Sequence, residues 1–122
     1  MVTYEDILQA WERWHATGSK RDWDALWLLT QERMGTLIKT SIRGRRVDDD
    51  DLHDMITGAT CSVMDRFRAA NYADLAWVRS RLCLIVGQVI VICSRKARAL
   101  NREVGLDDIP LAVDIMQKPC QA

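Results

Sequence analysis

The segment from residue 75 to residue 100 constrains the fold most, because it is long and apolar through its middle. Its run LCLIVGQVIVIC, residues 82–93, has twelve residues, whereas a membrane-spanning helix needs roughly 20. We therefore predict a buried, central helix that Asp74 caps. The residues expected to face inward are Leu75, Val78, Leu82, Ile85, Val86, Val89, Ile90, Cys93 and Ala97. The alternative is a buried strand over residues 85–92, although no second strand is available to pair with it.

Apolar residues at helical spacing predict two helices before this one, joined by a short break. Thr3 and Asp6 resemble a capping box before the first helix, which Gly18 ends. Ser19 is placed to cap the second helix, which is expected to end at Gly44. Its apolar stripe extends over five turns and consists of Trp23, Leu26, Trp27, Thr30, Met34, Leu37, Ile38 and Ser41.

A third helix is predicted to start within the aspartates of residues 48–54 and to close at Asn71. Its inner face is expected to contain Leu52, Met55, Ile56, Ala59, Val63 and Phe67. The pattern therefore indicates an all-α fold, a bundle of four to five helices. A chain of 122 residues forms one domain. We divide it into an N-terminal helix (1–18), a core (20–101) and a tail (102–122) that holds a short helix around 108–117 or an extended docking segment.

The formal net charge of the whole chain is zero, but residues of like charge are grouped into separate segments. The net charge is +4 over residues 19–46, −5 over 47–54 and +4 over 71–101. Zero net charge gives no global field that would attract nucleic acid or anionic membrane. The blocks instead predict surfaces of opposite sign that meet different partners. Asp48, Asp49, Asp50, Asp51 and Asp54 exceed what a helix start needs to offset its dipole, so we interpret them as a partner surface.

The residues with reactive or metal-binding side chains do not form a known catalytic pattern. Four cysteines occur without a CxxC pair and are interpreted as reduced core thiols of a cytoplasmic protein. His53 with Asp50 and Asp54 could suggest a metal site, but a solvated acidic face is the preferred interpretation. No phosphate-binding loop, GxSxG or HExxH motif occurs. We therefore expect that the protein has no enzymatic activity and binds neither a cofactor nor a metal ion.

Four of the five tryptophans, Trp11, Trp14, Trp23 and Trp27, are expected to meet where the first two helices join. Packing in the core is the preferred interpretation of this cluster. A surface groove for a partner is the alternative, because tryptophan is also favoured at interfaces.

Three motifs follow one another along the predicted helices. DDDLHDMI, residues 49–56, contains Asp50, Asp51, Leu52 and Asp54, LAWVRSRL spans residues 75–82, and GQVIVICSRKAR spans residues 87–98. Together with the order of elements over roughly residues 20–100, they resemble region 2 of sigma-70-family initiation factors, especially the extracytoplasmic-function type. The first motif matches the family's acid-acid-Leu segment, with Asp54 where Gln is usual, and the second is similar to the Trp-Leu start of the family's last helix. The third is similar to the Asn-x-x-x-Asp-x-x-Arg end of that helix, with Gln88, Ile92 and Arg95 at those positions.

The resemblance implies a cytoplasmic transcription regulator with two kinds of contact. Docking on the clamp of the RNA polymerase core would involve Asp50, Asp51, Leu52 and Asp54. Contact with promoter DNA would involve Arg79, Arg81, Gln88, Arg95, Lys96 and Arg98. The alternative is a helical adaptor or inhibitor, of phage or plasmid origin, that binds a protein without DNA. The apolar residues of the tail predict that it folds back on its own domain or forms a homodimer through residues 102–122.

Overall fold

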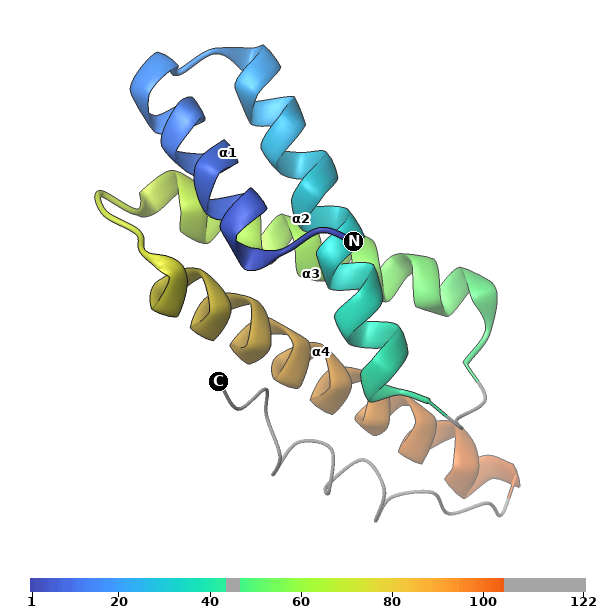
Figure 1. Ribbon diagram of the computed structural model, residues 1–122. Helices are drawn as coiled ribbons and strands as arrows, with labels where there is room; N and C mark the ends of the chain where they lie inside the picture. Colours follow the sequence, from blue (N-terminus) through green and yellow to red (C-terminus); the bar gives the residue numbers. More distant parts are fainter. Residues whose placement is uncertain (44–46, 105–122) are drawn as a thin grey trace.

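The computed structural model describes residues 1–43 and 47–104, and for residues 93–104 it describes the backbone only. Four helices follow one another: α1 (Tyr4–Thr17), α2 (Lys20–Ser41), α3 (Asp49–Ala69) and α4 (Leu75–Val104). The all-α prediction is confirmed, and no strand occurs in the described ranges (Figure 1). The alternative strand over residues 85–92 is wrong, since these residues lie within α4. The predicted tail helix around 108–117 lies outside the described residues.

The helix starts and ends follow local hydrogen-bonding chemistry. Thr3 and Asp6 form the expected capping box, and the Ser19 side chain accepts a hydrogen bond from the Asp22 backbone at the start of α2. Gly18 ends α1 in the left-handed conformation with φ of 64°, which favours glycine. At α4, the Trp77 backbone N–H donates to Asp74 Oδ1 over 2.7 Å, so Asp74 is the predicted cap.

Two helix ends differ from the prediction by a few residues. α2 ends at Ser41, with Ile42 as its C-cap, and so stops before Gly44. α3 ends at Ala69, with Ala70 in an extended conformation as C-cap, and so stops before Asn71. In both cases the helix ends without a glycine or asparagine as its C-cap, and the C-cap residues Ile42 and Ala70 pack against the core.

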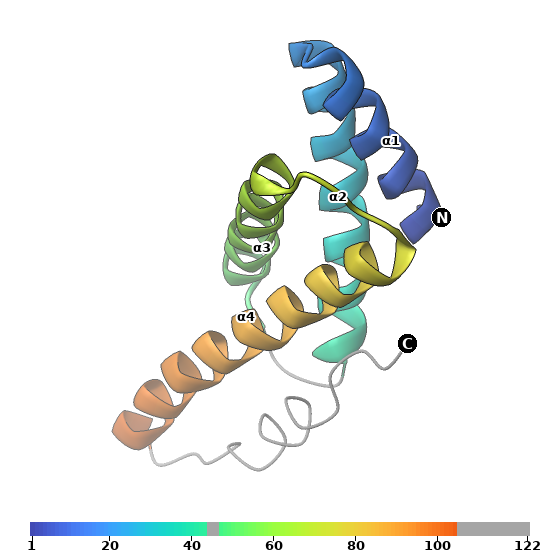
Figure 2. The same ribbon diagram turned by 90° about the vertical axis from the view of Figure 1, so that its left-hand side faces the viewer.

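α1 and α2 form a hairpin, and α3 and α4 pack against it on one side (Figures 1 and 2). α2 contacts the other three helices. α4 also contacts all three, and its core residues lie between Trp77 and Ile90. The last turns of α4 run beyond the ends of the other helices (Figure 2). The hairpin therefore provides the layer on which α3 is held in place.

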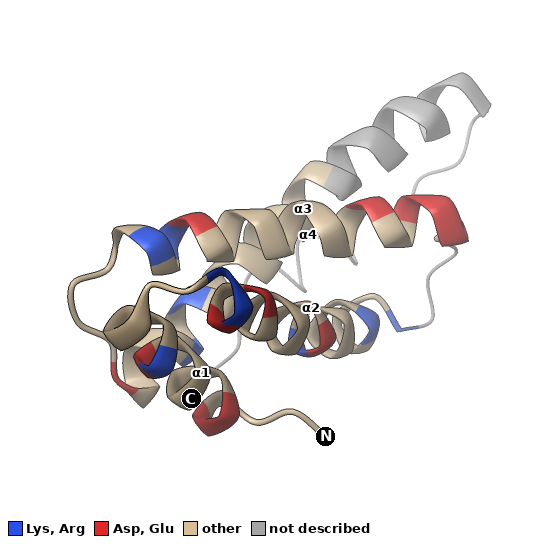
Figure 3. Ribbon diagram, turned by 90° about the horizontal axis from the view of Figure 1, so that it is seen from above, with Lys and Arg blue, Asp and Glu red and all other residues tan. Residues whose placement is uncertain are grey.

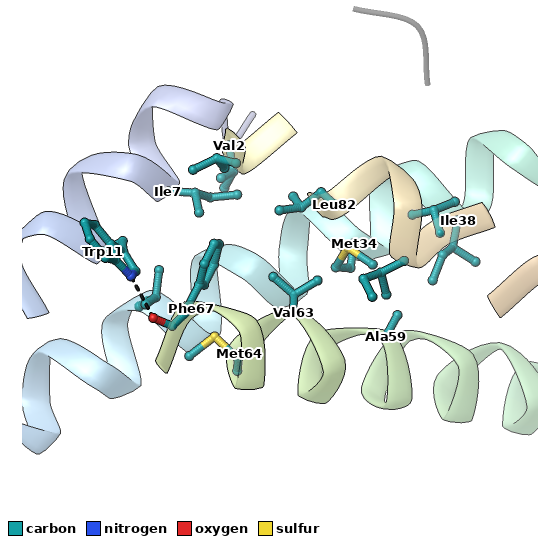
Figure 4. Packing of buried hydrophobic residues seen from close by; sticks show 14 of the residues in the cluster. Val2, Ile7, Trp11, Met34, Ile38, Ala59, Val63, Met64, Phe67 and Leu82 are labelled. Carbon is teal, nitrogen blue, oxygen red and sulfur yellow. Dashed lines mark hydrogen bonds between the residues drawn. The ribbon is translucent and has the colours of Figure 1, made fainter. Parts of the chain in front are cut away.

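The core is built from side chains that all four helices contribute (Figure 4). The largest completely buried apolar side chains are Phe67, Ile7, Leu26, Met34, Ile38, Leu82, Val63 and Val78. Trp11 is 4 % exposed, and its Nε1 donates a hydrogen bond of 3.0 Å to the Phe67 carbonyl oxygen. This bond ties α1 to the end of α3, at a carbonyl oxygen that also accepts from the Ala70 backbone N–H.

The inward face of α4 is largely as predicted, but α4 packs on one side only. Val78, Leu82, Ile85, Val86 and Ile90 are buried, and Val89 is partly buried. The prediction for Leu75 is wrong, because this side chain in the first turn is 47 % exposed. The helix is thus a core element with one face turned away from the other three helices.

The residues Leu75–Ile92 also form a helical segment long and apolar enough to cross a membrane, with a mean hydropathy of 1.7. One third of this segment is buried inside the structure. The core helix of a soluble bundle has the same length and composition, so these two properties do not separate a membrane segment from a core helix.

The cysteines divide between core and surface. Cys83 is buried as predicted, whereas the prediction of a core position for Cys61 is wrong, since it is exposed on α3. Cys61 lies between Ala59 and Val63 in sequence but points away from the apolar stripe that these two residues share. The side chains of Cys93 and Cys120 lie outside the described residues.

Candidate protein-docking site

Four exposed carboxylates mark the beginning of α3, and we call Asp49, Asp50, Asp51 and Asp54 the acidic start. They gather at one end of α3, whereas basic residues lie at its other end (Figure 3). Asp50 and Asp54 are four positions apart and so share a face of the helix. The acidic start therefore presents a compact negative surface to solvent.

The residues between these carboxylates hold the acidic start on the packed bundle. Leu52 packs against the core, Met55 is only 6 % exposed, and Ile56 is partly buried. A Cβ added to Gly35 of α2 would lie 3.6 Å from Ile56 Cδ1, so α2 and α3 approach each other closely here. The first turns of α3 are thus fixed in position while their carboxylates stay in water.

Among the described side chains, neither a capping hydrogen bond nor an ion pair accounts for the carboxylates at the start of α3. Asp48 is the N-cap of α3, yet its side chain makes no capping hydrogen bond. No side chain in residues 1–43 or 47–92 forms an ion pair with a carboxylate of the acidic start. Within the same ranges no group of three His, Cys, Asp or Glu side chains could hold a metal ion, and His53 is exposed. The carboxylates of the acidic start are thus exposed to solvent.

The predicted DNA-contacting residues of α4 whose side chains are described, Arg79, Arg81 and Gln88, lie on two sides of the helix. Arg79 is partly buried, with its guanidinium 5.6 Å from the centroid of the Tyr4 ring of α1. Arg81 is partly buried, with its guanidinium 5.6 Å from the Trp77 ring, and Gln88 is exposed. Arg81 and Gln88 are seven positions apart and share one face, which Arg79 does not. The side chains of Arg95, Lys96 and Arg98 lie outside the description.

A cluster of side chains around Tyr4, at the first turn of α1, was not predicted from the sequence. The Arg33 guanidinium lies 4.4 Å from the centroid of the Tyr4 ring, and the Tyr4 hydroxyl lies 3.8 Å from Cys83 Sγ. Burial raises the pKa of the Tyr4 hydroxyl, while its hydrogen bond with Arg33 acts in the opposite direction. These residues come from three helices, so no local spacing in the sequence indicates that they meet.

The tryptophans do not form one cluster. Trp14 and Trp23 are partly buried with ring centroids 4.6 Å apart, and the Arg68 guanidinium lies 4.6 Å from the Trp23 ring. Trp11 instead packs toward α3, as described above, and Trp27 is partly buried against the core. Packing between helices therefore accounts for most of their surface, and a tryptophan-lined groove is not needed to explain them.

Comparison of the chain with protein-family models, with curated proteins and with solved structures found no match. The resemblance to sigma region 2 therefore stays a prediction from the motifs. The assignment as an all-α bundle rests on the four helices themselves.

Proposed function

We propose that the protein is a sigma-region-2-like transcription regulator that docks on the RNA polymerase core. The contact would be made by Asp50, Asp51 and Asp54, with Leu52 as the apolar residue between them. The observation that carries the proposal is the acidic start itself: exposed carboxylates without a described ion-pair partner, on the packed first turns of α3. In the resembling family this segment binds the clamp.

The chemistry of such a contact follows from the charge and the exposure of the acidic start. A partner surface rich in Arg and Lys would be attracted over about 10 Å at 0.1 M salt, the distance at which screening becomes strong. Charge complementarity of this kind sets the association rate and orientation more than the raw affinity. A helix already fixed by Met55 and Ile56 loses little conformational freedom on binding.

Docking is tested by charge reversal with a matched control. In Asp51→Arg/Asp54→Arg the recovery of RNA polymerase core in a pull-down is expected to fall roughly tenfold or more, because two favourable contacts become repulsive. Glu12→Arg/Asp65→Arg changes the charge equally at exposed positions outside the acidic start and should bind as the wild type does. Melting curves verify that both variants are folded. Equal recovery of polymerase with both variants would refute the docking proposal.

A second candidate is a helical adaptor or inhibitor that binds its protein partner without DNA. The position of Arg79 favours it, because this residue is partly buried beside Tyr4 and does not share a face with Arg81 and Gln88. Zero net charge also favours it. The basic sequence at the end of α4 argues for DNA contact instead, since Lys and Arg that neutralise phosphates supply most non-specific affinity.

Fluorescence anisotropy with duplex DNA at low salt separates the two candidates. A DNA-binding protein should lose affinity in Arg95→Ala/Lys96→Ala/Arg98→Ala, and the slope of log K against log salt should fall by about 3. The control Arg13→Ala/Lys20→Ala/Arg21→Ala removes the same charge from exposed positions on α1 and α2. Weak binding that is equal in the wild type and in both variants is the result expected of an adaptor.

A further inference from the structure

A regular row of side chains runs along the side of α4 that faces away from the other three helices (Figure 2). They recur at intervals of three and four residues, and we call them the outer row: Trp77, Arg81, Leu84, Gln88 and Val91. Leu84 and Gln88 are exposed, and the other three are partly buried. This spacing is the one along which two long helices pack against each other. The outer row therefore has the pattern of a helix-packing surface.

The middle of this surface is uncharged and apolar. Leu84 is 45 % exposed, and Ile92, next to Val91 in the sequence, is 54 % exposed. The segment Leu75–Ile92 has a mean hydropathy of 1.7, although only a third of it is buried. Exposed apolar side chains that are grouped in this way, and not scattered singly, are typical of an interaction surface.

The distribution of charge along α4 indicates which occupant fits. Asp74 is exposed just before the helix and is the only acidic residue between positions 71 and 102. Most basic residues of this range come near the end of the helix: Arg95, Lys96, Arg98 and Arg102. A second α4 running parallel would bring like charges together at both ends. An antiparallel copy instead brings Asp74 to the basic end of its partner, and complementary charge of this kind fixes register.

One antiparallel register suits the middle of the outer row. If the twofold axis is level with Val86, Leu84 lies opposite the partner's Gln88, and Arg81 lies opposite the partner's Val91. Leu84 can then pack on the aliphatic part of the glutamine. The apolar Val91 can pack on the methylene stem of the arginine, whose charged head stays in water.

The same register brings complementary groups together at the two ends. Asp74 faces the partner's Arg98, and Trp77 faces the partner's Arg95, a favourable pair because the faces of aromatic rings attract cations. Twofold symmetry repeats each of these contacts. We propose that the outer row of α4 is the interface of an antiparallel homodimer. The contact is a single pair of helices, which is a small interface, so the dimer should dissociate at micromolar concentrations.

Sedimentation equilibrium of the full-length chain tests the position of the interface. The wild type should be a dimer at high concentration and a monomer after dilution. Leu84→Glu places a carboxylate in the middle of the interface and should raise the dimer Kd at least about tenfold. Leu28→Glu is the matched control, because Leu28 is 64 % exposed on α2, and its Kd should equal that of the wild type. Melting curves verify that both variants are folded.

The antiparallel register is tested by charge. Arg98→Glu turns both contacts with Asp74 into repulsion and should raise the dimer Kd about tenfold, whereas Arg13→Glu, at an exposed position on α1, should not change it. Adding Asp74→Asn to Arg98→Glu should recover part of the loss. Asparagine removes the repulsion and caps a helix as well as aspartate does.

Three results would each overturn the proposal. The first is a wild type that stays monomeric at every concentration. The second is a dimer that Leu84→Glu leaves intact, since the interface would then lie elsewhere. The third is a dimer that Arg98→Glu does not weaken. A monomer whose affinity for duplex DNA falls in Leu84→Glu and not in Leu28→Glu would assign the outer row to DNA and would likewise contradict the dimer.

Discussion

Val86→Asp is expected to unfold the protein at room temperature. Val86 is 2 % exposed on the inner face of α4, and a carboxylate there would be moved from water into the apolar core. The cost is several kcal/mol, while a domain of this size is stable by only about 5–15 kcal/mol. Circular dichroism should show loss of the helical signal and of the cooperative melting transition.

Ala76→Asp is the matched control for this substitution. It introduces the same side chain in the first turn of α4, at an exposed position. Its melting temperature should stay within a few degrees of the wild type, because surface substitutions usually change stability by less than about 0.5 kcal/mol. A cooperative transition near the wild-type temperature in Val86→Asp would mean that α4 does not pack on the bundle.

Trp11→Ala should cost about 3–5 kcal/mol of unfolding free energy. Trp11 is 4 % exposed, and truncation would leave a large void between α1 and α3 in addition to removing the hydrogen bond to the Phe67 carbonyl. Trp11→Phe separates the two effects, since it keeps most of the apolar volume. It should cost about 1 kcal/mol for the lost bond, because Phe67 O also accepts from the Ala70 N–H over 3.3 Å. Urea denaturation at 25 °C measures both.

Trp14→Phe serves as the control, because Trp14 lies one turn later on α1 and is only partly buried against Trp23. It should destabilise the protein less than Trp11→Phe does. Equal losses for the two Phe variants would show that the hydrogen bond to α3 contributes nothing beyond the lost indole surface.

The helices and their caps could be predicted from the sequence because they depend on near neighbours. Thr3 with Asp6, Gly18 and Asp74 act within one turn of their own positions, and the stripes of α2 and α3 repeat at the helical period. The orientation of α4 could not be predicted as well. Its middle is apolar on nearly every side, so periodicity does not distinguish the buried Leu82 from the exposed Leu84.

The candidate docking site was predictable in position and charge, because five carboxylates in one short segment exceed the needs of a helix start. Their exposure and the packing of Leu52 and Met55 beneath them came from the fold. The contacts of Tyr4 with Arg33 and Cys83 were not predictable, since these residues lie far apart in the chain and meet only when three helices assemble.

The two long-range contacts of α1 have a consequence for the order in which the bundle assembles. Trp11 reaches 56 residues ahead to Phe67, and Tyr4 reaches 79 residues ahead to Cys83. Of the four helices α1 comes first in the chain, yet its docking surface is complete only after α3 and the first half of α4 have been synthesised. Because closing such long loops costs entropy that only finished contacts repay, the contacts that α1 makes beyond its neighbour α2 should form late in folding.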